Sequence, residues 1–158
     1  MKIELSNGRP ASRNDIAEFE EKLGESLLPD FLVFVQQNDG SEPETNIFKI
    51  GTTNESGVNG FIPIREIVGE MQKIDNLPAR SFPIAWAEGG NYVFINQALS
   101  GAVFFWDHEL PDNLIRLSDS FLSFLESLEP FDIRAIKLKP GQVKKAWIDP
   151  DFLKSLGN

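Results

Sequence analysis

The chain has 158 residues, of which 41% are hydrophobic and 25% are charged, and its 13 phenylalanines indicate an aromatic core rather than disorder. These values are typical of a soluble globular protein, and we expect residues 1–158 to form one domain. The lack of cysteine excludes disulfides and thiolate catalysis, and a single histidine leaves too few ligands for a structural zinc site.

The formal net charge of −9 is unevenly distributed. Residues 134–147, called here the basic segment, hold five Lys and Arg and no acid, which leaves ten basic against 24 acidic residues, or −14, elsewhere. Such an acidic body repels phosphate backbones, so we expect no direct nucleic-acid binding. On composition alone we interpret the acidity as serving solubility, and attraction to a basic protein surface is the alternative.

No targeting or membrane segment is predicted. The first ten residues contain no apolar signal-peptide core, and no apolar run approaches the roughly 20 residues that span a bilayer. We therefore expect a cytoplasmic protein with no membrane partner.

Two helices are predicted in the first 40 residues. Ser12 is a good N-cap with Asp15 three residues later, and a second helix should begin near Pro29 and end at Gly40. The first helix carries an apolar stripe at helical spacing, made by Ile16, Phe19 and Leu23. The next elements expected are an acidic loop over 40–46, a strand over 47–50, a polar, mobile loop over 52–60 and a helix over 64–74.

Three strands joined by short Gly-rich turns follow, over 82–86, 91–96 and 102–108, and this pattern is typical of an antiparallel meander. The second and third strands are apolar on both alternating faces, so both faces should be covered. A further strand is expected over 114–117. Asp119 or Ser118 should then cap a helix that ends at Pro130, and a short helix that starts at Asp149 and Pro150 closes the chain.

The only histidine, His108, lies between Asp107 and Glu109. If the strand continued through these residues, His108 would point away from both carboxylates, and the three side chains would not converge on a metal. No serine lies in a G-x-S-x-G motif that would supply a nucleophile. We interpret these residues as the end of a strand, with side chains bonded to the following turn.

The remaining motifs indicate structure rather than chemistry. Gly89–Gly90 does not belong to a phosphate-binding motif and should form a tight turn with positive φ. The spacing of the carboxylates does not select a glycosidase pair. In the basic segment, Trp147 is expected to pack on the core, although stacking on a nucleic-acid base is the alternative.

Four stretches in the same order resemble a known family. They are "LPDFLVFVQQNDG" (28–40), "FPIAWAEGGNYVFIN" (82–96), "GAVFFWDHE" (101–109) and "LSDSFLSFLESL" (117–128). Together they resemble the SUKH superfamily, which includes the yeast cell-wall-assembly (glucan synthesis) regulator, and the resemblance covers roughly residues 12–129. Glu88 stands where members often have Asp, a mild departure.

The resemblance implies an α+β fold with a single, mostly antiparallel (mixed) sheet that has a central meander and helices packed around it. It implies a protein-binding domain without enzymatic activity, cofactor or metal. Many bacterial members are immunity proteins that neutralise polymorphic toxins, often nucleases, which makes a basic toxin domain the expected partner. A regulatory or scaffold domain of the cell-wall-assembly regulator type is the alternative.

Acidic side chains suit the basic cleft of a nuclease by charge complementarity, and partner surfaces tend to lie on loops. Apolar residues of the resembling stretches, Phe34, Trp86, Phe104 and Trp106, are expected to build the fold instead. The partner-binding residues predicted on this basis are Glu42, Glu44, Glu55, Glu88, Glu109 and Asp112.

Overall fold

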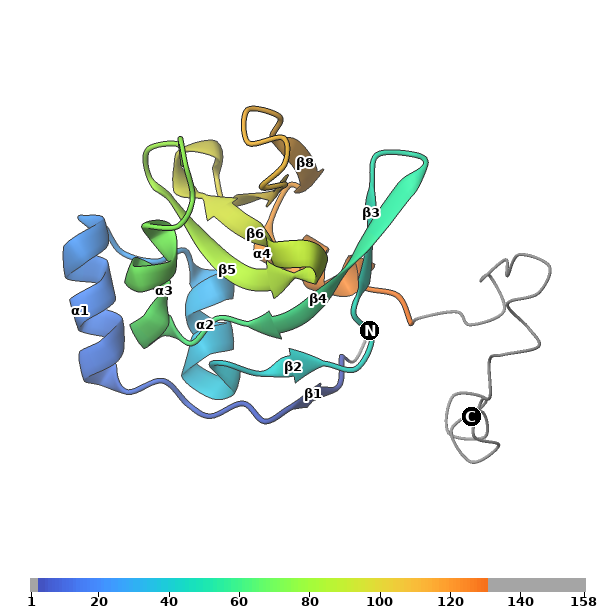
Figure 1. Ribbon diagram of the computed structural model, residues 1–158. Coiled ribbons are helices and arrows are strands. Elements are labelled where there is room, and N and C mark those ends of the chain that lie inside the picture. The colour runs from blue at the N-terminus through green and yellow to red at the C-terminus, as the bar shows by residue number, and fades with distance from the viewer. Residues whose placement is uncertain (1–2, 131–158) are drawn as a thin grey trace.

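The computed structural model describes residues 3–130 (Figure 1). Within this range the helices are α1 (Arg13–Leu23), α2 (Pro29–Asn38), α3 (Ile64–Met71) and α4 (Phe121–Ser127). The main sheet has the order β3-β4-β5-β6-β7-β8, formed by β3 (Ile47–Ile50), β4 (Asn54–Phe61), β5 (Ser81–Ala87), β6 (Asn91–Asn96), β7 (Ala102–Trp106) and β8 (Ile115–Ser118). A separate pair is formed by β1 (Leu5–Ser6) and β2 (Glu42–Pro43).

The α+β class and the meander are confirmed. Each neighbouring pair in the main sheet is antiparallel, so the described residues contain no parallel pair of the kind that a mixed sheet would have. The β1–β2 pair is an additional small sheet that the sequence pattern does not predict. None of the helices described in residues 3–130 is long and apolar enough to cross a membrane.

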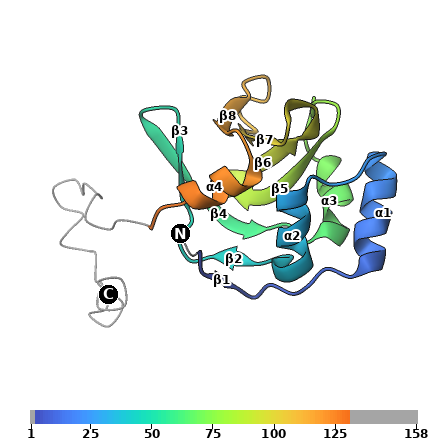
Figure 2. The same cartoon turned by 180° about the vertical axis from the view of Figure 1, so that it is seen from behind.

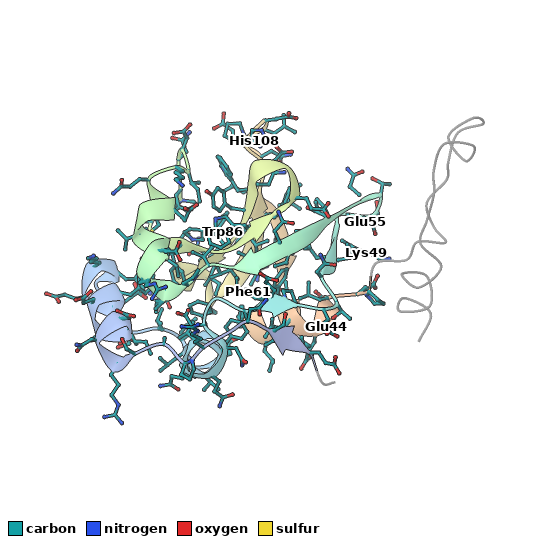
Figure 3. The ribbon with its side chains drawn as sticks, turned by 60° about the horizontal axis from the view of Figure 1, so that its bottom comes forward. Glu44, Lys49, Glu55, Phe61, Trp86 and His108 are labelled. Atoms are coloured by element: carbon teal, nitrogen blue, oxygen red, sulfur yellow. The ribbon has the colours of Figure 1, made fainter. Side chains whose placement is uncertain are left out.

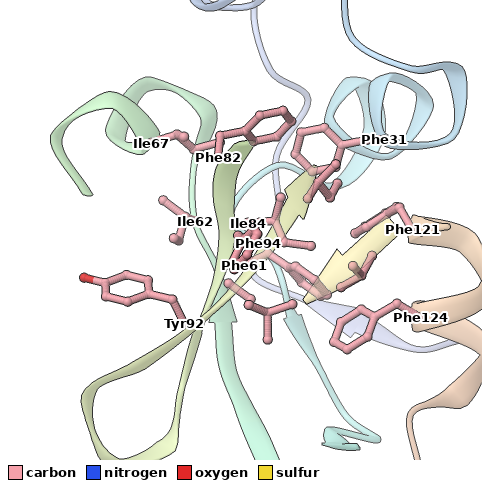
Figure 4. Packing of buried hydrophobic residues seen from close by; sticks show 14 of the residues in the cluster. Phe31, Phe61, Ile62, Ile67, Phe82, Ile84, Tyr92, Phe94, Phe121 and Phe124 are labelled. Atoms are coloured by element: carbon pink, nitrogen blue, oxygen red, sulfur yellow. The ribbon is translucent and has the colours of Figure 1, made fainter. Parts of the chain in front are cut away.

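The aromatic core lies between the sheet and helices α2 and α4 (Figures 2 and 4). Phe34 of α2 packs edge-on against Phe61 of β4 and Phe121 of α4, with both centroid distances at 4.9 Å. Phe48 of β3 contacts Phe124 of α4 at 5.6 Å. Such aromatic pairs contribute more than their buried area alone, so they add to the stability that burial gives this face.

The prediction of a mobile loop over 52–60 is wrong, because most of this segment belongs to β4, the second strand of the main sheet. Its polar composition is misleading, since Val58 and Phe61 are each only 2% exposed. Its glycines are buried where other side chains pass over the strand: Gly57 lies under Glu88 and Gly60 under Trp86. Glycine is favoured at such close approaches despite its low strand propensity.

Several element ends differ from the sequence prediction. Ser12 caps α1 as expected by accepting a bond from the Asp15 amide at 3.0 Å. Helix α4 is capped by Ser120 rather than by Asp119 or Ser118, and it ends at Ser127. Helix α3 ends at Met71 rather than at 74, and β7 ends at Trp106 rather than at 108. The expected 40–46 loop contains the short strand β2, and the predicted C-terminal helix and the basic segment lie outside the described residues.

Both faces of the central strands are covered as predicted. On β7, Val103 and Phe105 point toward the helices, and Trp106 on the opposite face is 5% exposed. Phe104 is partly exposed and stacks on Phe94 of β6 at 5.3 Å. The meander therefore has a second, smaller apolar layer on the face away from α2 and α4.

Candidate functional site

A hollow opens on this second face of the sheet, with a volume of about 410 Å³. We call it the sheet hollow. The residues that line it include Glu42, Asn59, Gly60, Phe61, Trp86 and Tyr92. Trp86 and Tyr92 supply apolar surface, while Glu42 and Asn59 supply polar groups. Phe61 borders the hollow, but its ring packs against Phe34 in the core on the opposite face. A mostly apolar concavity with a few polar groups is the usual form of a binding site.

Strand β2 places Glu42 at the border of the sheet hollow. The Phe61 amide of β4 donates to the carbonyl of Ser41 at 2.8 Å, which holds the start of β2 beside the end of β4. The β4–β5 register shifts between Val58 and Gly60, which brings Gly60 opposite Trp86. The site is thus assembled from a short strand pair and an irregular position in the main sheet.

Glu70 of α3 orients the aromatic residues of the sheet hollow. Its Oε2 accepts a bond from Trp86 Nε1 at 3.1 Å and a further bond from the Tyr92 hydroxyl, while Oε1 accepts from Lys73 Nζ at 2.9 Å. Partial burial opposes ionisation of Glu70, but these bonds outweigh it and keep its pKa below the ordinary value. Burial, with the Glu70 carboxylate nearby, raises the pKa of Tyr92. At neutral pH the network is therefore an ionised carboxylate held by neutral aromatic donors and one lysine.

The turn after β5 forms another part of the wall. Gly89 and Gly90 have φ of 74° and 81°, so the predicted tight turn with positive φ is confirmed. Asn91 follows, and its Oδ1 accepts the backbone amide of His108 at 3.0 Å and lies 2.7 Å from His108 Nδ1. His108 therefore joins the end of β7 to the wall of the sheet hollow.

The expected contacts around His108 are corrected in part. Because β7 ends at Trp106, strand alternation does not extend to His108. Asp107 does bond within the following turn, where its Oδ1 accepts the Glu109 amide at 2.9 Å. The His108 side chain bonds back to Asn91 of the preceding hairpin instead. In residues 3–130, no group of three His, Cys, Asp or Glu side chains is placed to hold a metal ion.

All six predicted partner-binding carboxylates are exposed, but they do not form one cluster. Glu42 lines the sheet hollow. Glu88 immediately follows Ala87, which lines the sheet hollow. The Glu88 side chain covers Gly57, where an added Cβ would lie 2.8 Å from Glu88 Oε1. Glu109 and Asp112 lie in the connection after β7, where the Asp112 carboxylate is 3.4 Å from Asn76 Nδ2.

The other two predicted residues lie further along the molecule. Figure 3 shows Trp86 and Phe61 between His108 at one end and Glu44 at the other. A hydrogen bond with Glu4, together with the like charge of that residue, raises the pKa of Glu44. Glu55 is on the β3–β4 hairpin, directly across from Lys49. Glu42 and Glu88 are therefore the predicted residues that the fold associates most closely with the sheet hollow.

The sequence pattern assigned Trp86 to the core and did not identify Glu70, Tyr92 or Asn59 as site residues. Trp86 is only partly buried, and its ring lines the sheet hollow. A signal was present in the sequence: Trp86 and Tyr92 flank the Gly-Gly turn and pair across β5 and β6, so they share a face. Glu70 lies on a separate helix, and its spacing from these residues indicates no contact.

Comparison with family models identifies a match over residues 10–127 to the SMI1/KNR4 family (SUKH-1). The chain belongs to the SMI1/KNR4 (SUKH-1) family. The match contains the whole sheet hollow, from Gly40 to Tyr92. No curated protein is significantly similar to the chain.

Membership in this family indicates the general function of the chain, that of a toxin-immunity or SMI1/KNR4-type regulatory domain. SUKH-1 domains are toxin-immunity proteins or SMI1/KNR4-type regulators, they are generally not catalytic, and the immunity proteins bind protein partners. The sheet hollow presents an aromatic surface beside the exposed carboxylate of Glu42.

Proposed function

We propose that this SUKH-1 protein is a cytoplasmic immunity protein that neutralises a toxin by binding a basic toxin domain, such as a nuclease domain. The observation that carries this proposal is the sheet hollow, where Trp86 and Tyr92 lie beside the exposed carboxylate of Glu42. Family membership supports a protein partner, and the net charge of −9 favours a basic one.

The proposed mechanism is steric and electrostatic rather than catalytic. A nuclease binds phosphates through Lys and Arg, so its substrate cleft is basic. Exposed carboxylates such as Glu42 and Glu88 accelerate the approach of that cleft, and the aromatic residues then supply buried contact area. The bound immunity protein occupies the cleft and keeps nucleic acid out. This function needs no cofactor or metal, no membrane and no direct contact with nucleic acid.

A regulatory scaffold of the SMI1/KNR4 type is the second candidate, because the matched family includes both roles. Genomic context separates the two. A neighbouring gene for a large secreted protein with a variable C-terminal domain favours immunity. Recovery of an endogenous partner other than a toxin, with no such gene nearby, favours the scaffold.

The test measures association with the toxin domain encoded by the neighbouring gene, using stopped-flow fluorescence over a range of salt concentrations. The variant Glu42→Lys/Glu44→Lys reverses two exposed carboxylates, Glu42 in the lining of the sheet hollow and Glu44 two residues away and outside the lining. The control Glu18→Lys/Glu21→Lys changes the net charge equally, but on exposed positions of α1. Both variants are first checked for unchanged thermal unfolding.

We expect wild-type association to be fastest at low salt, because steering raises on-rates by about 10–10³-fold and the Debye length falls to about 10 Å at 0.1 M salt. The Glu42/Glu44 variant should associate more slowly than the α1 control and should protect cells less well from the toxin. An on-rate that does not change with salt would contradict the electrostatic mechanism. No detectable binding to the toxin domain would contradict the immunity function and favour the scaffold.

A further inference from the structure

The indole of Trp86 is held in a fixed orientation at the sheet hollow. Its Nε1 is bonded to Glu70 at 3.1 Å, and Tyr92, which pairs with Trp86 across the sheet, bonds to the same carboxylate oxygen. Glu70 is also paired with Lys73, two residues after the end of α3, so its charge is already partnered within the chain. The polar edge of the indole is therefore engaged, while Trp86 lines the sheet hollow and its ring atom Cε3 lies next to Gly60.

Gly60 keeps open the space between the Trp86 ring and Glu42. A Cβ at this position would lie 3.8 Å from Trp86 Cε3 and 3.6 Å from Glu42 Cγ, both ordinary contact distances. The indole and the Glu42 side chain thus border the same space, which any side chain at position 60 would begin to fill. Because neither contact is a clash and Gly60 has no positive φ, substitution there can fill the hollow without backbone strain.

Glu42 supplies negative charge to this space. Its side chain is exposed, and its polar contact within the described part of the chain is a long one, with Asn7 Nδ2 at 3.5 Å. Among residues 3–130, the ion pairs involve Glu70, Glu25, Asp107 and Asp119, but not Glu42. Asn59 donates to the Ala87 carbonyl at 3.4 Å, which leaves its Oδ1 as an acceptor at the sheet hollow.

We propose that the sheet hollow receives one arginine side chain of the partner protein, with its guanidinium between the Trp86 ring and the Glu42 carboxylate. A cation is attracted to the face of an indole within about 6 Å of its centre, and arginine also pairs with carboxylates in a planar, bidentate manner. The guanidinium carries further N–H donors, for which Asn59 Oδ1 is an acceptor. A lysine presents a compact charge that matches this planar arrangement less well.

This inference deepens the proposed function, because the arginine belongs to the toxin domain proposed above. In the first experiment, Glu42→Gln removes the charge and Gly60→Leu fills the space, while Glu44→Gln is the matched control, an exposed carboxylate two residues away and outside the lining. We expect the first two variants to weaken toxin binding by at least about 30-fold, as for a central anchor residue, and the control to stay within about threefold. Thermal unfolding of Gly60→Leu, compared with wild type and with Gly60→Ala, which adds only a Cβ, checks that an effect on binding does not arise from unfolding. Toxin binding that survives both Glu42→Gln and Gly60→Leu would overturn the inference while leaving the immunity function in place.

The second experiment needs no toxin. The full chain is titrated with Nα-acetyl-arginine methylamide while the ¹⁵N–¹H signal of the Trp86 indole, assigned with a Trp86→Phe variant, is followed by NMR. Nα-acetyl-citrulline methylamide, which has nearly the same shape but no charge, is the control. We expect a saturable shift with the arginine compound, a much smaller one with citrulline, and loss of the difference in Glu42→Gln. Equal shifts with both compounds, or none with arginine, would overturn the inference even if the toxin binds.

Discussion

Trp106 and Trp86 lie on the same face of the sheet and flank the same residue, Tyr92, on neighbouring strands. Trp106 is 5% exposed, and its Nε1 has no hydrogen-bond partner within the described residues. Trp86 is partly exposed, is bonded to Glu70 and lines the sheet hollow. One face of the sheet therefore contains a closed region around Trp106 and an open region around Trp86.

The difference between the two regions indicates different roles. A buried indole whose N–H has no hydrogen-bond partner among the described residues contributes to stability through its packing. An indole fixed at its polar edge and exposed on its ring is arranged for contact with another molecule.

Replacement of Trp106 should cause the largest loss of stability. Trp106→Ala should lower the free energy of unfolding by about 3–5 kcal/mol, the usual range for large buried aromatics. That is a large part of the roughly 5–15 kcal/mol available to a domain. Trp86→Ala should cost less than half as much but should weaken partner binding more. Chemical denaturation of both variants measures this, and equal losses, or a larger loss for Trp86→Ala, would remove the distinction between the regions.

Glu70→Gln should have the next largest effect, a loss of about 1–3 kcal/mol at pH 7, because it removes the charge that Trp86, Tyr92 and Lys73 bond. The folded-state pKa of Glu70 lies below its ordinary value of 4.5, so its contribution is present above that pH and declines as pH falls through the folded-state pKa. The difference in free energy of unfolding between Glu70→Gln and wild type should therefore be largest near neutral pH and smaller at acidic pH. Urea denaturation from pH 3 to 7 measures it, and a difference that grows in acid would contradict the assigned network.

Asp39, outside this network, should show the opposite pH dependence. Burial raises its pKa from 3.8 to about 6, despite the bond that its carboxylate accepts from the Ile64 amide at 2.9 Å. The protonated Asp39 side chain therefore stabilises the folded state fully below pH 3.8, and this stabilisation is lost as the pH rises through 6. Asp39→Asn keeps an acceptor for Ile64 without the charge.

The free energy of unfolding of Asp39→Asn should exceed that of wild type by about 1 kcal/mol at pH 7 and by little at pH 4. The partial exposure of Asp39 keeps the effect small. Urea denaturation of Asp39→Asn and Glu70→Gln over the same pH range measures how the free energy of unfolding of each variant changes with pH. A variant less stable than wild type at pH 7 would show that the ionised carboxylate stabilises the start of α3 instead.

The closed region can be predicted from the sequence better than the open region. Alternation in β6 and β7 predicted buried residues on both faces, because a strand between two layers is apolar at every position. Trp106 was therefore identified as buried from its neighbours alone. Family resemblance supplied the α+β class and the general role, which composition and spacing do not determine.

The sheet hollow was harder to predict, because it depends on residues from four elements. Glu42 was selected for its charge, but its position beside Trp86 depends on the bond between Phe61 and Ser41. Strand β4 was interpreted as a loop because glycine and asparagine normally indicate turns. Here Gly57 and Gly60 allow other side chains to pass over the strand, which becomes apparent only when the partner strands are placed.

His108 provides the smallest expected effect. Its ring bonds to Asn91 Oδ1, but its backbone amide donates to the same oxygen at 3.0 Å, and that second bond survives replacement of the side chain. His108→Ala should therefore cost no more than about 1 kcal/mol, the usual net value of one hydrogen bond. Because the turn at Asn91 stays in place, partner binding should remain within about tenfold of wild type. Thermal unfolding and toxin titration measure the two effects, and metal analysis of the purified protein provides an independent check. A stoichiometric metal that is lost in His108→Ala would show that His108 binds metal. Abolished partner binding in a folded His108→Ala variant would show that His108 contacts the partner. Either result would contradict a purely structural role of His108 through its contact with Asn91.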